Sequence, residues 1–163
     1  MSNTEKFSAT ELTLLKQCID LAEDALEAGD QPFGSILVNE KNEVIAKARN
    51  SVNESNQTAH PEIKLARWAA NNLTKDERKR TRMFTSGEHC PMCAAAHGWV
   101  NLGPIVYIHS GQQLGQWLTE FEAPASPINF YPIEEIINDI NLRGPVPELV
   151  PKMKELHRRY YSS

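Results

Sequence analysis

Two short motifs in the sequence carry residue types that bind metal ions. His60-Pro61-Glu62 precedes one stretch of helical periodicity, and Cys90-Pro91-Met92-Cys93 opens another. Proline is well suited to the first turn of a helix, so both motifs are predicted to lie at helix starts. One histidine and two thiolates would supply three ligands and leave the fourth tetrahedral position for water. This donor set indicates a catalytic zinc site rather than a structural one.

The helix starts also favour the charges that such a site requires. Their free backbone amides and the positive end of the helix dipole favour thiolates over thiols at Cys90 and Cys93. Glu62 lies two residues after His60 and could carry a proton from water to a leaving amine without binding the metal. We therefore predict His60, Cys90 and Cys93 as the metal ligands and Glu62 as the catalytic acid and base.

Two other interpretations of the cysteine pair stay open. A Cys-x-x-Cys segment at a helix start is also typical of a thioredoxin-like redox motif. A structural zinc site would need a fourth ligand, for which His89 and His97 are candidates. Because a disulfide exchanger has no need of the upstream His60 motif, the catalytic metal site is favoured.

The composition limits the class of protein. The chain has 163 residues, three cysteines and a formal net charge of −4. Its length fits one domain, residues 1–163, with a single core. Because the cysteines are few and odd in number, no disulfide framework is expected, and Cys18 is predicted to be a core residue. The negative charge gives no bulk attraction to nucleic acid, which argues against nucleic acid as the main partner.

No targeting or membrane segment is expected from the composition. Residues 1–30 contain acidic and amide side chains throughout and lack the apolar region of a signal peptide. No later stretch approaches the roughly 18 apolar residues of a membrane helix. We therefore expect a cytoplasmic location and no membrane partner. The basic stretch KDERKRTR at 75–82 is interrupted by two acidic residues and is predicted to be a solvated loop.

Hydrophobic periodicity predicts alternating helices and strands. A capping box at 8–11 starts a helix that ends at Gly29, and the apolar runs 35–38 and 44–48 form a β-hairpin. The later helices are expected from Pro61, from Pro91, at 112–118 and at about 147–161, with strands at 82–86 and 104–110 and an irregular segment at 122–132. The helix from Pro91 is predicted to bury Met92, Ala95, Ala96, Trp99 and Val100. This order predicts an α/β sandwich with an antiparallel first hairpin, parallel later strands and helices on both faces.

The motifs together resemble the cytidine-deaminase superfamily, whose zinc-dependent base deaminases carry H-x-E followed by P-C-x-x-C. The segments PFGSILV, ARN, HPE and CPMC occur here in the order of that family. Pro61 stands where the family usually has alanine, and His89 stands where it usually has proline. His89 is interpreted either as a hydrogen-bond donor near the site or as an exposed residue. The resemblance implies a three-layer α/β/α sandwich with a mixed five-stranded sheet, one Zn²⁺ per subunit and a homodimer.

Two groups within the superfamily share the PFG and PMC segments: guanine deaminases acting on free bases, and bacterial tRNA adenosine deaminases. Trp99 resembles the tryptophan that guanine deaminases carry on this helix, and the tyrosines that end the segment 147–161 resemble those of a segment which that group exchanges between subunits. The resemblance therefore implies hydrolysis of guanine to xanthine and ammonia. A tRNA adenosine deaminase and a cytosine or nucleoside deaminase are the alternatives.

Five residues are candidate contacts for a small nucleobase substrate. The Asn50 amide offers both a donor and an acceptor to a purine edge, and substrate binding is preferred to the turn role that asparagine can also take. Phe33 and Trp99 could form the walls of a flat pocket. By similarity, a carboxylate should accept hydrogen bonds from ring N–H groups, and Glu122 is preferred to Glu120 for this role. Tyr161 is the candidate for closing the pocket. Three other histidines are predicted to be packing or surface residues: His97, His109 and His157.

Overall fold

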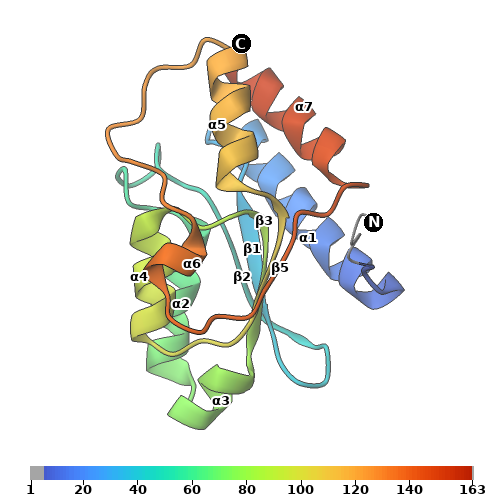
Figure 1. Ribbon diagram of the computed structural model, residues 1–163, viewed down its shortest axis with the longest axis vertical. Helices are drawn as coiled ribbons and strands as arrows, with labels where there is room; N and C mark the ends of the chain where they lie inside the picture. The colour runs from blue at the N-terminus through green and yellow to red at the C-terminus, as the bar shows by residue number, and fades with distance from the viewer. Residues whose placement is uncertain (1–5, 163) are drawn as a thin grey trace.

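A computed structural model describes residues 6–162 and arranges them in three layers (Figure 1). The middle layer is a five-stranded sheet of order β2-β1-β3-β4-β5. Strand β1 (Gly34–Val38) pairs antiparallel with β2 (Val44–Arg49) and with β3 (Arg82–Gly87). Strand β4 (Ile105–His109) runs parallel to β3, and β5 (Leu142–Arg143) runs parallel to β4. The predicted mixed sheet is confirmed.

Helices cover both faces of this sheet, which Figure 1 shows nearly edge-on. On one face α1 (Ala9–Glu27) packs against α7 (Val150–Tyr161), which also contacts α5 (Gly111–Glu120). On the other face α2 (Pro61–Asn72) packs beside α4 (Pro91–Trp99), which contacts α6 (Ile133–Ile136). The short α3 (Lys75–Arg80) lies between α2 and β3 in the chain. The predicted three-layer α/β/α sandwich is therefore confirmed.

The first helix lies directly on the central strand β1. Its predicted capping box is present, because Ser8 Oγ accepts from Glu11 N at 3.1 Å and Glu11 Oε1 accepts from Ser8 N at 2.9 Å. The helix meets the strand at Gly34, where a Cβ atom would lie 2.5 Å from the Cys18 carbonyl oxygen. Glycine therefore permits the close approach that seals this side of the core, and Cys18 is fully buried as predicted.

The central strands form the base on which the site is built. Every residue of β1 is buried, and β3 and β4 are buried over nearly all of their length. This is the pattern of strands covered by helices on both faces. One apolar cluster packs the sheet against α1, α5 and α7, and a second packs it against α2. The ends of β3 and β4 are consequently fixed in position on both sides.

The basic stretch after α2 differs from the prediction. Residues 75–80 form the helix α3 rather than a loop, because Thr74 and Glu77 make another capping box. None of the residues of α3 is buried, so the expected solvation is confirmed for 75–80, whereas Thr81 after the helix is 3% exposed.

The predicted buried side of α4 is right only in part, because Ala96 and Val100 pack against a core cluster but Trp99 does not. The helix buries Cys93, Ala94 and His97, whereas Trp99 is 86% exposed and the other predicted positions are partly exposed. Cys93 and His97 are one turn apart and share a face. Because that face turns inward, Trp99 lies on the outside.

The predicted single domain of residues 1–163 extends beyond the described residues at both ends. Among residues 6–162, none of the helices combines the length and the apolar character that crossing a membrane requires.

Candidate metal centre and catalytic site

The two metal-binding motifs meet where two helices begin. Strand β3 ends at Gly87, and Cys90 caps the following helix α4. His60 caps the neighbouring helix α2. A proline follows each of these caps in the first turn, as predicted. The positive ends of two helix dipoles therefore lie close to the motifs and favour anionic groups there.

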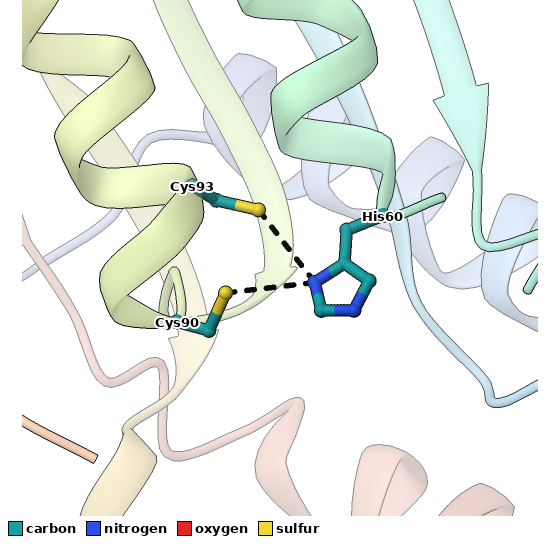
Figure 2. Close-up of side chains that lie close together, drawn as sticks. All are labelled: His60, Cys90 and Cys93. Atoms are coloured by element: carbon teal, nitrogen blue, oxygen red, sulfur yellow. Dashed lines mark hydrogen bonds between the residues drawn. The ribbon is translucent and has the colours of Figure 1, made fainter. Parts of the chain in front are cut away.

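His60, Cys90 and Cys93 point toward one another (Figure 2). Nδ1 of His60 lies 3.5 Å from Sγ of Cys90 and 3.6 Å from Sγ of Cys93, and all three donor atoms lie within 4.8 Å of one another. Ligands at the usual distances of about 2.3 Å for zinc–sulfur and about 2.0 Å for zinc–nitrogen are about 3.5 Å apart at a tetrahedral angle. The donor set and its spacing therefore fit one zinc ion.

The cluster has the ligand count of a catalytic site. Among the described residues 6–162, it is the one group of at least three metal-binding side chains that lie this close, and neither His89 nor His97 belongs to it. A structural zinc site has four protein ligands, whereas a catalytic site keeps one position for water or substrate. The structure therefore favours the catalytic interpretation.

The two thiols and the imidazole interact strongly. Hydrogen bonds from the Cys93 thiol and from His60 lower the pKa of Cys90 to about 4. The hydrogen bond to Cys90 and burial raise the pKa of Cys93. The hydrogen bond with Cys90 also raises the pKa of His60. Zinc binding requires both thiolates and a neutral imidazole, so the site must release protons when it takes up the metal.

Glu62 is a buried carboxylate beside this cluster. It is 4% exposed and lies in the first turn of α2. Its Oε1 accepts hydrogen bonds from Thr85 Oγ1 at 3.0 Å and from Ser35 Oγ at 3.5 Å, and these hydroxyl oxygens are 2.7 Å apart. Burial raises the pKa of Glu62. A fixed carboxylate with a raised pKa is well suited to proton transfer near neutral pH.

A cavity of about 760 Å³ adjoins the metal cluster. His60, Glu62 and Cys90 line one part of it, and residues from both helical layers and from the irregular segment line the rest. Ligand pockets usually enclose about 300–1,000 Å³. The cavity is therefore large enough for a planar heterocycle next to Glu62.

Two of the five predicted substrate contacts, Phe33 and Tyr161, line this cavity. Tyr161 comes from α7 of the same chain, and its hydroxyl accepts a hydrogen bond from Gln31 Nε2 at 3.3 Å. The helix starts at Val150, slightly later than predicted. Exchange of this segment between subunits stays a prediction.

The structure does not bring the other three predicted contacts to the cavity. Among the residues described as its lining, Asn50, Trp99 and Glu122 are absent. Asn50 is buried, and its Oδ1 accepts from the Val52 amide at 3.1 Å, which is the turn role left open by the sequence. Glu122 is exposed with a φ of 55° just after α5, and Trp99 borders a second cavity against α6. Loop direction and helix rotation decide these positions, and local pattern fixes neither.

Glu88 is a structural residue of the site that the sequence did not reveal. Its Oε1 accepts from the Gly111 amide at 2.8 Å, and its Oε2 accepts from the Ile133 amide at 2.9 Å. It therefore ties the end of β3 to the starts of α5 and α6, and it also lines the cavity. The available signal was an acidic residue two positions before the first predicted cysteine ligand.

Two further histidines, His89 and His157, line the cavity as well. They are 3% and 1% exposed. The interpretation of His89 as an exposed residue is therefore wrong. His97 and His109 are also buried, as expected of packing residues, and they are not among the described lining residues.

Several known proteins with similar sequence or structure are deaminases. Residues 8–109 match the cytidine and deoxycytidylate deaminase zinc-binding region. A probable cytosine deaminase of Schizosaccharomyces pombe is 33% identical over 70% of this chain and 68% of that protein. The guanine deaminase of Bacillus subtilis is 35% identical over 58% of this chain and 62% of that protein. These matches span roughly two thirds of each relative, and tRNA-specific adenosine deaminases are also among the relatives.

The fold is shared with a guanine deaminase from Nitrosomonas europaea. Its solved structure superposes with a TM-score of 0.72 at 18% identity, over 99% of this chain and 90% of that chain. At this identity the likeness concerns the fold alone.

Proposed function

Because the chain belongs to the family defined by the cytidine and deoxycytidylate deaminase zinc-binding region, we propose that it removes an amino group from a free nucleobase by hydrolysis. Guanine, converted to xanthine and ammonia, is the first candidate. The observation that carries the proposal is the buried Glu62 carboxylate next to three metal-binding side chains on the wall of one cavity. A thiol redox protein has no use for this arrangement.

His60, Cys90 and Cys93 would hold a zinc ion, which when bound supplies Lewis-acid activation of water. Glu62 moves the protons of the reaction. Because Thr85 holds Oε1 of this carboxylate, Oε2 takes a proton from the attacking water and delivers it to the departing amine. The amine-bearing ring carbon gains the oxygen of the water molecule, its C–N bond breaks, and ammonia leaves.

The surroundings of Glu62 support both halves of this proton transfer. A carboxylate with an ordinary pKa is a poor acid at neutral pH, and burial raises the pKa of Glu62 toward the range where it can both accept and donate. Free backbone N–H groups at the starts of α2 and α4 can stabilise negative charge that develops on the ring. Phe33 provides an aromatic wall for a flat ring.

Two features support a free base over tRNA as the substrate. The net charge of −4 gives no bulk attraction to the phosphates of RNA, on which the salt-dependent affinity of an RNA-binding enzyme rests. In addition, the C-terminal helix α7 contributes His157 and Tyr161 to the cavity lining, which suits a small ligand held on several sides. Cytosine is the second candidate, because the Schizosaccharomyces pombe relative is named a probable cytosine deaminase.

The proposal is tested by measuring ammonia release from guanine, an aminotriazine, cytosine, cytidine, adenosine and guanosine. We expect turnover of at least one free base by the zinc-loaded protein and its loss in Glu62→Gln, with the zinc content unchanged. Glu27→Gln is the matched control, because Glu27 is exposed at the end of α1. Deamination of a tRNA substrate without activity on any free base would overturn the choice of substrate, and full activity of Glu62→Gln would overturn the mechanism.

A further inference from the structure

Four buried histidines form two pairs near the cavity. The rings of His89 and His97 meet edge to face, with centroids 5.3 Å apart and planes at 84°. The rings of His109 and His157 do the same at 5.2 Å and 90°. One member of each pair, His89 and His157, lines the cavity, whereas its partner lies behind it.

The two histidines behind the lining each bond to the backbone. Nε2 of His97 donates to the Gly103 carbonyl oxygen at 2.8 Å, and Nδ1 of His109 donates to the Ser110 carbonyl oxygen at 3.3 Å. Their second nitrogens have no partner within the described chain, and a Cβ at Gly87 would lie 2.7 Å from Nε2 of His109. These two residues are accounted for by packing and by their backbone hydrogen bonds.

The other two histidines also have unpartnered nitrogens, but their side chains line the cavity. Within residues 6–162, both ring nitrogens of His89 lack a hydrogen-bond partner, and so does Nε2 of His157. Burying an unpaired polar nitrogen costs stability, and an apolar side chain of similar size would avoid that cost. Both side chains line the cavity, and their buried nitrogens come within reach of a ligand when the rings turn toward it.

The His157 ring packs between two aromatic side chains and carries no charge at neutral pH. His157 packs against Phe33 at a centroid distance of 4.9 Å and against Trp117 at 5.9 Å. Burial keeps the pKa of His157 well below the usual value, with a smaller contribution from the neighbouring His109. A neutral imidazole has one N–H donor and one acceptor nitrogen, so each ring can recognise either a carbonyl or an N–H group.

We propose that His89 and His157 bind the substrate by hydrogen bonds through these nitrogens and so select which amino-heterocycle the site accepts; this inference rests on the proposed deaminase function. His89 precedes α4 in one helical layer, and His157 belongs to α7 in the other. They therefore contact different edges of a flat ring. The substrate class is a planar heterocycle with a ring nitrogen, N–H or carbonyl on two edges besides the amine-bearing carbon, as in aminopurines and aminotriazines.

Variant kinetics test the inference with a matched control for each histidine. His157→Phe keeps an aromatic ring but removes both nitrogens, and His109→Phe makes the same change behind the lining. For whichever base of the panel is turned over, His157→Phe should raise KM about 3- to 10-fold, as expected for one uncharged hydrogen bond. His157→Gln, which retains a hydrogen-bonding atom, should recover part of the loss, and His109→Phe should leave KM nearly unchanged.

His89→Phe is compared with His97→Phe, which makes the same change behind the lining. Zinc content is measured in each variant because Cys90 follows His89. A second measurement needs no change to any of the four histidines. Protein with ¹⁵N-labelled histidine and the Glu62→Gln substitution is loaded with zinc and mixed with guanine, cytosine or the aminotriazine. The ring ¹⁵N signals of His89 and His157 should shift on binding, whereas those of His97 and His109 should stay in place.

The outcomes separate this inference from the function on which it rests. If a base is deaminated in a Glu62-dependent way but the signals of His89 and His157 do not move and their variants match the controls, the inference is wrong and the function stands. If no base in the panel is deaminated and none shifts any histidine signal, both are overturned.

Discussion

Replacing Glu88 by glutamine should loosen two walls of the cavity while the metal cluster stays intact. The Glu88 carboxylate accepts from the Gly111 amide at 2.8 Å and from the Ile133 amide at 2.9 Å, and these amides start α5 and α6. A glutamine side chain keeps one acceptor oxygen but turns an NH₂ group toward the other backbone N–H. One hydrogen bond to a charged acceptor is therefore lost, and two donors face each other.

The size of the effect follows from the kind of bond that is lost. A hydrogen bond to a charged group contributes about 1.5–3 kcal/mol, and the partial exposure of Glu88 favours a loss of about 2 kcal/mol in the free energy of unfolding. For a domain of this size the Tm falls by about 2–4 °C per kcal/mol, which gives a decrease of about 4–8 °C. Because Tyr131 and Pro132 line the cavity next to Ile133, KM should rise as well.

Thermal unfolding of the zinc-loaded protein measures this decrease, and zinc content and steady-state kinetics are determined on the same preparation. Glu134→Gln is the matched control, because Glu134 lines the same cavity but is exposed and takes part in none of the hydrogen bonds described for residues 6–162. If the Tm of Glu88→Gln lies within about 1 °C of that control, the two backbone bonds do not hold α5 and α6, and the reasoning fails.

Three other changes test separate parts of the structure. Cys93→Ser should lower the zinc content far below one ion per chain, because zinc prefers thiolate to hydroxyl ligands, and an unchanged content in atomic absorption would contradict the metal assignment. Thr85→Val should reduce kcat about 10-fold or more with zinc retained, because it removes the 3.0 Å hydrogen bond that fixes Glu62; an unchanged rate of ammonia release would argue against that role. Gly34→Ala should cost about 1–3 kcal/mol of stability, since a Cβ there would lie 2.4 Å from Leu21 Cβ. A Cβ at Gly115 would meet no atom within 4 Å. Gly115→Ala is therefore the control, and thermal unfolding should show a lower Tm for Gly34→Ala but not for Gly115→Ala.

Local chemistry was readable from the sequence because it depends on neighbours within a helical turn. The capping box at Ser8, the prolines after His60 and Cys90, and the spacing of the two cysteines each act over at most four residues. The order of strands and helices follows from hydrophobic periodicity in the same way. The metal-binding side chains could therefore be named before their positions were known, and the structure brings them together.

Local patterns were less reliable where two signals competed. The basic stretch at 75–80 has the composition of a solvated loop, yet the capping box of Thr74 and Glu77 makes it a helix. In α4 nearly every residue is small or apolar, so periodicity gave little information about which side is buried. The requirement that Cys93 face His60 sets the rotation of this helix and leaves Trp99 exposed.

Only the tertiary structure decided which side chains surround the cavity. Glu88 bonds to Ile133, 45 residues away, and Tyr161 bonds to Gln31, 130 residues away. His157 lies on a helix that periodicity predicts, but its place at the cavity depends on how α7 packs against α1, α5 and β4. The sequence by itself determined the candidate ligands and the candidate acid–base residue, because their chemistry is carried by short motifs at helix starts. The lining of the cavity is set by contacts between distant segments, which no local pattern records.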